Sequence, residues 1–163
     1  MAMNINWYPG HMKKTKEEIA NNLKLVDIVL EIIDARIPES SRNPMLDEII
    51  GDKPRMIIMN KADLADKDIN RRWIRKFKED GIPAITMNSK EKINVSRIYD
   101  LAKEELADKF ARNEAKNIEN PVIRMMIVGV PNAGKSTFIN NVAKRKSANV
   151  GNRPCLLYTS PSP

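Results

Sequence analysis

Residues 129–137 read GVPNAGKST and match the pattern G-x-x-x-x-G-K-[ST] in full. In this pattern the glycines let backbone N–H groups curl around phosphate, and the N-terminus of the following helix adds a favourable dipole. Lys135 would neutralise β- and γ-phosphate oxygens, and the Ser136 hydroxyl would bind a magnesium ion. A glycine-rich turn with a surface lysine is the alternative, but the match lies between an apolar run and a helical pattern, which favours a phosphate site. The predicted phosphate-binding residues are Gly129, Val130, Pro131, Asn132, Ala133, Gly134, Lys135, Ser136 and Thr137.

A second motif, Asn60-Lys61-Ala62-Asp63, directly follows an apolar run. The Asp63 carboxylate can accept hydrogen bonds from N1–H and the amino group of guanine, and adenine lacks both donors, so ATP would leave this charge unpaired. Lys61 would lay its stem along the base, and Asn60 would tie this loop to the phosphate loop. Alone, the tetrapeptide could be a turn at a helix start. Together with the phosphate motif it predicts binding of GTP or GDP.

A third segment, Asn88-Ser89-Lys90, follows another β-rich run. The backbone N–H groups of Asn88 and Ser89 could meet the carbonyl oxygen of guanine. A plain loop fits Ser89 equally well. We include both residues among those expected to bind the nucleotide.

Four apolar, β-rich runs cover residues 28–33, 55–59, 83–87 and 122–128. Their continuous apolarity is typical of strands buried on both faces, as in a parallel sheet. Because helical patterns lie between the runs, the sequence predicts a doubly wound α/β sheet in one domain. The guanine and phosphate motifs follow strand ends and therefore share the ligand-binding edge of such a sheet.

Three intervening helices are expected. Ile69, Trp73 and Phe77 recur every four residues, and Gly81 offers a C′ position that ends their helix. Asn43-Pro44 is typical of an N-cap and first helical position, with a short helix through Ile50. The longer third helix is marked by the apolar positions Val95, Ile98, Ala102, Leu106 and Phe110.

Other features indicate function less specifically. Residues 34–44, DARIPESSRNP, follow the first strand and belong at the ligand edge, although a loop with a helix cap is the simpler interpretation. His11, the sole histidine, lies among aromatic and basic residues that suit RNA contact, but a lone histidine is usually structural. The basic run 71–76 is interpreted as a solvated helix face with Trp73 turned inward, with RNA contact as the less favoured alternative.

Composition limits the classes of function. The net charge of +7 and the pI of about 9.5 suggest a polyanionic partner, with nucleic acid as the leading candidate. A single cysteine, Cys155, allows no internal disulfide and no cysteine-rich metal site, and cytoplasm is the expected location. No apolar run approaches the ~18 residues of a membrane span. Residues 155–163, CLLYTSPSP, show no helical or strand period, so we leave them out of the fold and expect a domain at residues 1–154.

The chain resembles the circularly permuted GTPases of the YlqF/RbgA family, which act in assembly of the large ribosomal subunit. Residues 7–14 (WYPGHMKK), DARIPESSRNP, NKAD and GVPNAGKST are similar to its signatures and stand in its order. The guanine motif precedes the phosphate loop, the reverse of ordinary GTPases, and the resemblance explains this reversal. It implies a P-loop G domain, GTP or GDP with Mg²⁺, and a ribosomal precursor with its RNA as partners, with no membrane or DNA partner.

The resemblance also implies roles in hydrolysis and potassium binding. The family lacks the usual catalytic glutamine, so His11 is a candidate to orient water, and Asn132 resembles an asparagine that holds potassium in related GTPases. After Arg153-Pro154 the family continues with a switch threonine and Asp-x-x-Gly, which this sequence does not show. We therefore expect an incomplete G domain, with the 122–128 strand as an exposed apolar edge and little GTP hydrolysis by this chain alone.

Two alternatives remain open. One is a basic RNA-binding module whose nucleotide site is only structural, and the other is a P-loop ATPase. The NKAD motif speaks against the ATPase. RNA affinity measured with GTP, with GDP and without nucleotide distinguishes a switch from a module, because a module gives one value.

Overall fold

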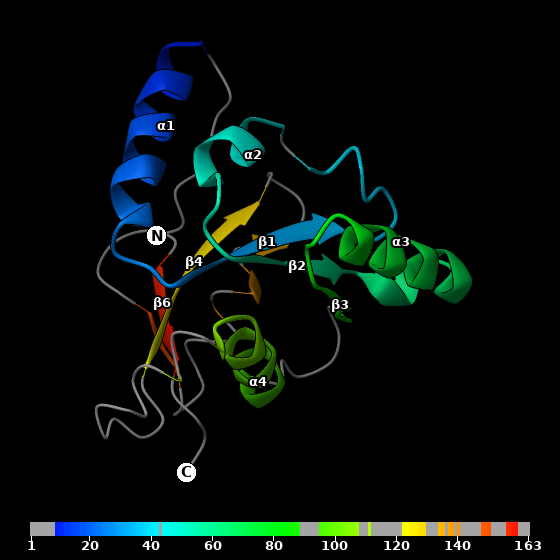
Figure 1. The fold of residues 1–163 in the computed structure, drawn as a ribbon. Helices are drawn as coiled ribbons and strands as arrows, with labels where there is room; N and C mark the ends of the chain where they lie inside the picture. Colours follow the sequence, from blue (N-terminus) through cyan, green and yellow to red (C-terminus); the bar gives the residue numbers. More distant parts are fainter. Residues whose placement is uncertain are drawn as a thin grey trace.

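The computed structural model describes residues 9–42, 44–88, 95–107, 122–129, 134–135, 137–138, 148–150 and 156–159, together with Ala111 and Asn140. At its centre six strands form one sheet in the order β3-β2-β1-β4-β6-β5 (Figure 1). None of the described helices combines the length and apolarity needed to cross a membrane.

Four strands of the sheet are parallel, as the sequence predicted. They are β1 (Ile28–Asp34), β2 (Arg55–Asn60), β3 (Ala84–Thr86) and β4 (Ile123–Gly129). Every residue of β1 is buried, which explains its nearly continuous apolar sequence. Since β1 lies between β2 and β4, the guanine and phosphate motifs follow strands on either side of one central strand.

The expected apolar edge at β4 is wrong, because a further strand covers it. β6 (Leu156–Thr159) pairs antiparallel with β4, and β5 (Ala148–Val150) pairs antiparallel with β6. The sequence analysis left Leu156–Thr159 outside the fold because four residues are too short for a period to be recognised. In the structure this short apolar segment forms a strand because the backbone N–H and C=O groups along the free edge of β4 pair with it.

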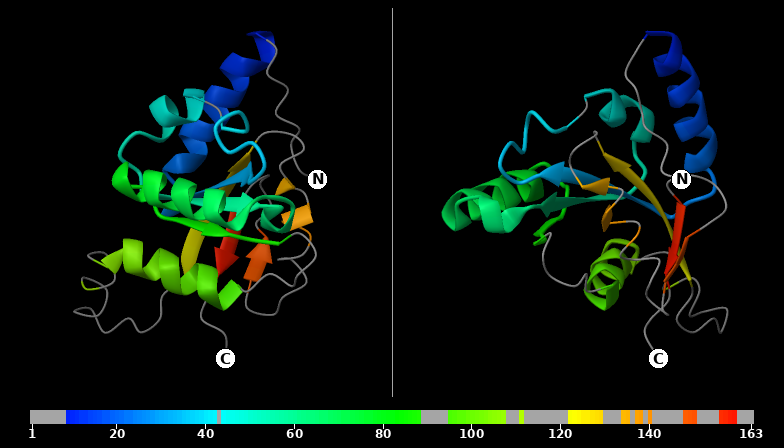
Figure 2. Two further views of the ribbon diagram at one scale, coloured as in Figure 1. Left: turned by 90° about the vertical axis from the view of Figure 1, so that its right-hand side faces the viewer. Right: turned by 180° about the vertical axis from the view of Figure 1, so that it is seen from behind.

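Helices cover both faces of the sheet (Figures 1 and 2). α1 (Pro9–Leu23), α2 (Pro44–Ile50) and α3 (Lys67–Glu79) contribute to the two apolar clusters on one face. α4 (Val95–Glu105) packs on the other face, where Ile98, Ala102 and Leu106 are buried against β1, β2 and β4. This arrangement confirms the doubly wound α/β class.

The predicted α3 has clear ends. The Asp66 carboxylate caps its N-terminus by accepting hydrogen bonds from the backbone N–H groups of Asp68 (2.8 Å) and Ile69 (3.1 Å). Gly81 has a φ of 79°, as expected for the residue that ends a helix. Phe77 is buried and Trp73 packs beside it, but Ile69 is 48% exposed and does not belong to the buried stripe.

The loop between β1 and α2 is held by its own polar side chains. The Ser41 hydroxyl accepts a hydrogen bond from Asp34 N (3.0 Å) and donates to the carbonyl of Ile37 (2.8 Å). Arg42 Nε lies 3.2 Å from Oε2 of Glu31, a β1 residue only 1% exposed, and its guanidinium lies 5.5 Å from the centre of the Phe77 ring. Most of this segment therefore stabilises the fold, in agreement with the simpler interpretation of its sequence.

Candidate nucleotide-binding site

The carboxyl ends of β1, β2 and β4 bring the two nucleotide motifs to one edge of the sheet. Asp34 at the end of β1 is in register with Asn60 at the end of β2, and Ile32 is in register with Gly129 of β4. The backbone N–H of Ala35 donates to the carbonyl of Asn60 (2.8 Å). This hydrogen bond fixes the start of the NKAD segment, residues 60–63, which we call the guanine loop. This edge is where open α/β sheets bind ligands.

Asn60 contacts the phosphate loop directly. Gly134 has a φ of 94°, and a Cβ atom placed on it would collide with Nδ2 of Asn60, which is itself 3% exposed. The structure therefore joins two motifs that are far apart in the sequence, as predicted for Asn60. Gly129 is also closely packed, since a Cβ there would lie 2.8 Å from the carbonyl oxygen of Ile32. Both glycines permit close approaches that any larger residue would prevent.

The guanine loop is held in an unusual backbone conformation. Lys61 has a φ of 59°, in the left-handed region, and is the one non-glycine residue with positive φ in the described part of the chain. Such a conformation persists where the surroundings fix it, often at ligand sites. Ala62 supplies that restraint: its N–H donates to the carbonyl of Met87 (3.0 Å), and its carbonyl accepts from Asn70 Nδ2 of α3 (3.3 Å).

Asp63 lies within the short 3₁₀ turn η1 (Ala62–Leu64), and its side chain is exposed. The turn places an accessible carboxylate beside the restrained Ala62, where a ligand can reach it. Asn88, half-buried, follows Met87 at the end of β3. The hydrogen bond from Ala62 to Met87 therefore places the end of β3 next to the guanine loop.

Asp34 connects the guanine loop to the loop after β1. Its Oδ2 lies 2.7 Å from Nη2 of Arg36 and 3.6 Å from Nζ of Lys61. The hydrogen bonds from Arg36 hold the pKa of the Asp34 carboxyl below its ordinary value against the opposing effect of burial, and the charge of Lys61 lowers this pKa further. Asp34 is thus a carboxylate at neutral pH and holds the Lys61 ammonium in place.

The end of the phosphate loop leads into a helix. Lys135 is 8% exposed, and the backbone N–H of Phe138 donates to the carbonyl of Gly134 (2.9 Å). Phe138 is buried against the sheet and anchors this helix start, whereas Thr137 is exposed. A largely buried lysine beside a glycine-lined turn fits a bound phosphate chemically, because the turn offers backbone N–H groups and the lysine offers a positive charge.

Several predicted site residues lie outside the described part of the chain. They are Ser89, Val130, Pro131, Asn132, Ala133 and Ser136. The magnesium and potassium assignments to Ser136 and Asn132 therefore stay predictions. His11 lies in α1, and its side chain also falls outside the description.

Two residues that shape the site, Asp34 and Asn70, were not predicted from the sequence. Asp34 was predicted only as part of the 34–44 segment at the ligand edge, with no role of its own, although its place at a strand end beside the NKAD strand was a usable signal. Asn70 gave a second signal, because it is a polar residue on the same helical face as Trp73, Ile74 and Phe77. Both contact the guanine loop directly, Asp34 through Lys61 and Asn70 through Ala62.

We expect Gly134→Ala to weaken binding of GDP by at least about tenfold, because the added Cβ would separate the phosphate loop from Asn60 and strain a positive φ. Titration of a fluorescent GDP analogue measures this effect. Gly81→Ala is the matched control: its φ is also positive, but its Cβ would meet nothing within 4 Å. It should lower stability by about 1 kcal/mol without changing GDP affinity. Equal GDP affinity of the two variants would contradict the contact.

Comparison with known proteins is consistent with this geometry. The family described as "50S ribosome-binding GTPase" matches residues 124–156. "Ribosome biogenesis GTPase A" of Bacillus licheniformis is 47% identical over 152 residues, which cover 93% of this chain and 54% of that protein. "Mitochondrial ribosome-associated GTPase 1" of Mus musculus is 36% identical, over 91% of this chain and 46% of that protein.

The chain belongs to the YlqF/RbgA family of GTPases. Solved structures agree with this membership. The GNP-bound crystal structure of YlqF from T. maritima matches with a TM-score of 0.57 and 31% identity, over 81% of this family member and 48% of that chain. A GDP-bound YlqF structure matches with a TM-score of 0.57 and 28% identity, over 90% and 56%. The chain spans about half the length of these relatives.

Proposed function

We propose that this chain binds GTP and GDP with magnesium, and that it forms part of a GTPase acting in assembly of the large ribosomal subunit. The observation that carries this proposal is the contact between Gly134 and Asn60, which joins the phosphate loop to the guanine loop. Neither motif alone specifies a guanine nucleotide, but the two on one sheet edge do. The printed names of the relatives support the ribosomal part.

In the proposed site each described residue has a separate role. Lys135 neutralises phosphate oxygens, and Asp63 accepts hydrogen bonds from the guanine base. Lys61 lies along the base, with Asp34 holding its ammonium group. Ser136 would hold the magnesium ion, which would neutralise charge that develops on the phosphates during their transfer.

The reversed order of the motifs is compatible with this function. Strand β4, which leads into the phosphate loop, pairs with β1, and β1 pairs with β2, which leads into the guanine loop. The spatial neighbours of the site depend on this pairing and not on which strand is synthesised first. Function follows the assembled site.

For the hydrolytic step we propose His11 as the residue that orients water, and Asn132 as a potassium ligand. Both roles would apply in a longer family member, one that also has the segments which the relatives carry outside the matched region. Turnover of GTP by such a protein should fall when potassium is replaced by sodium. Equal turnover in the two salts would contradict the proposal that Asn132 binds potassium.

Lys135→Ala tests the phosphate site. The substitution removes a buried charge that would face the phosphates, so we expect GDP and GTP affinity to fall more than tenfold, a loss of at least ~1.4 kcal/mol. Calorimetric titration with GDP measures it, and Lys24→Ala, which removes an exposed lysine outside the site, is the matched control. A dissociation constant unchanged in Lys135→Ala would mean that the loop is only a turn.

A further inference from the structure

Helix α3 has a dense positive charge on its exposed side, its outer half. It has six basic and two acidic residues, an excess of four, while the whole chain has an excess of seven. The basic residues, all exposed, are Lys67, Arg71, Arg72, Arg75, Lys76 and Lys78. Among α1, α2, α3 and α4, helix α3 has the largest excess of positive charge.

The inner half of α3 is committed to the fold. Phe77 packs in the apolar cluster with β1 and β2, and Asn70 donates to the guanine loop. Trp73 packs against Phe77, with ring centres 5.7 Å apart, and Lys76 Nζ lies 4.7 Å from the centre of the Trp73 ring. With Trp73 engaged in this way, the outer half offers cations and no aromatic platform on which a base could stack.

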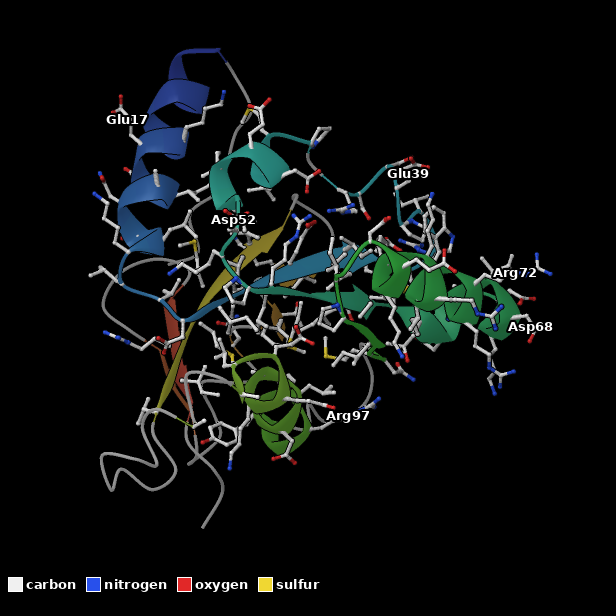
Figure 3. All side chains as sticks on the ribbon, viewed as in Figure 1. Glu17, Glu39, Asp52, Asp68, Arg72 and Arg97 are labelled. Atoms are coloured by element: carbon white, nitrogen blue, oxygen red, sulfur yellow. The ribbon has the colours of Figure 1, made fainter. Side chains whose placement is uncertain are left out.

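The cations of the outer half are weakly compensated. Arg71 pairs with Asp68 at 3.4 Å, but their side chains are 76% and 80% exposed, so this pair contributes little. No acidic side chain in the described part of the protein pairs with Arg72, Arg75 or Lys78. Figure 3 shows Arg72 extending from α3 away from the sheet.

The spacing of these cations suits a continuous anionic chain. Arg71, Arg75 and Lys78 are separated by four and three residues, so they share one side of the helix and cover about 10 Å along its axis. The arginine guanidinium binds phosphate through two parallel hydrogen bonds, which favours phosphate over isolated carboxylates. Asp68 and Glu79 interrupt the row near its ends and would disfavour an acidic partner there.

We propose that the outer half of α3 is a docking surface for the phosphate backbone of structured RNA. It would recognise the spacing of phosphates and not the base sequence, because it offers charge without stacking groups. This inference rests on the proposed ribosomal role and adds where on the domain the RNA lies. The surface consists of exposed side chains and does not include Asn70, through which α3 contacts Ala62.

Binding of the 163-residue chain to a fluorescent RNA hairpin, measured by anisotropy over a range of salt, tests the surface. The test variant is Arg72→Gln with Arg75→Gln. The control is Lys16→Gln with Lys24→Gln, which removes the same charge within α1 and just after it. We expect the test variant to lose at least about tenfold in affinity and to lower the slope of log K against log salt by about 1–2. The control should bind like the unmutated chain.

The possible failures are distinguishable. Equal effects of the two double variants would overturn the α3 surface while leaving the proposed nucleotide site and ribosomal role intact. No binding of the unmutated chain at low salt would overturn the RNA partner itself. Displacement of the RNA by polyaspartate at equal charge concentration would show that the α3 surface does not prefer phosphate groups to carboxylates. Unchanged GDP affinity in both variants is expected and shows that each is folded.

Discussion

Asp63→Asn is expected to exchange the base preference of the site from guanine to xanthine. The carboxylate accepts from two donors of guanine, whereas an amide offers one acceptor and one donor, and the xanthine carbonyl can accept from that donor. Sites built to hydrogen-bond a group discriminate by factors of about 10⁴, so we expect GDP affinity to fall at least about 100-fold. Competition of GDP, XDP and ADP against a fluorescent guanine nucleotide measures the exchange.

Asp66→Asn is the matched control for this change. It makes the same substitution three residues away, at the N-cap of α3, where asparagine also accepts hydrogen bonds from backbone N–H groups. Its base preference should equal that of the unmutated chain. Equal affinity of the unmutated chain for ATP and GTP would show that Asp63 does not read the base.

Arg42→Ala is expected to lower the free energy of unfolding by about 3–5 kcal/mol, because it leaves a buried carboxylate without its partner. Glu31 is 1% exposed within β1, and Arg42 is the basic residue that contacts it. The same substitution also removes the stacking of the guanidinium on Phe77. Urea unfolding, followed by tryptophan fluorescence, measures the loss.

A double variant separates the buried pair from simple loss of packing. Glu31→Met with Arg42→Met replaces both charges by apolar groups, and such replacements are often neutral or stabilising. Its stability should therefore exceed that of Arg42→Ala by several kcal/mol. If the double variant is as unstable as Arg42→Ala, the unpaired charge is not the cause.

The sequence was sufficient for the parallel part of the fold because its strands are buried on both faces. Such strands need apolar residues at nearly every position, and this signal is visible without any knowledge of their neighbours. Helix α1 was not predicted because it has too few apolar positions to form a visible helical period. Among the side chains described for it, only Ile19 and Leu23 are buried. β6 escaped because its pairing with β4 depends on a distant strand.

The predictions about the site also divide into those that rest on local patterns and those that depend on distant contacts. The G-x-x-x-x-G-K-[ST] and NKAD patterns are local, so the roles expected of Lys135 and Asp63 needed only short stretches of sequence. The contribution of Asn70 depends on how α3 lies over η1, and that of Asp34 on its register with Asn60. A single sequence contains no direct record of either contact.

The central position of β1 has a consequence for how the protein folds during synthesis. One of its neighbours, β2, follows it closely in the chain, but β4 is distant: the Asp27 carboxylate accepts from the backbone N–H of Arg124, 97 residues later. The guanine loop therefore leaves the ribosome well before β4, the second neighbour of β1. Contacts between such distant segments form slowly, and until β4 arrives β1 has an open edge with mostly apolar side chains. The nascent chain is thus most exposed to misfolding in the interval before its nucleotide site exists.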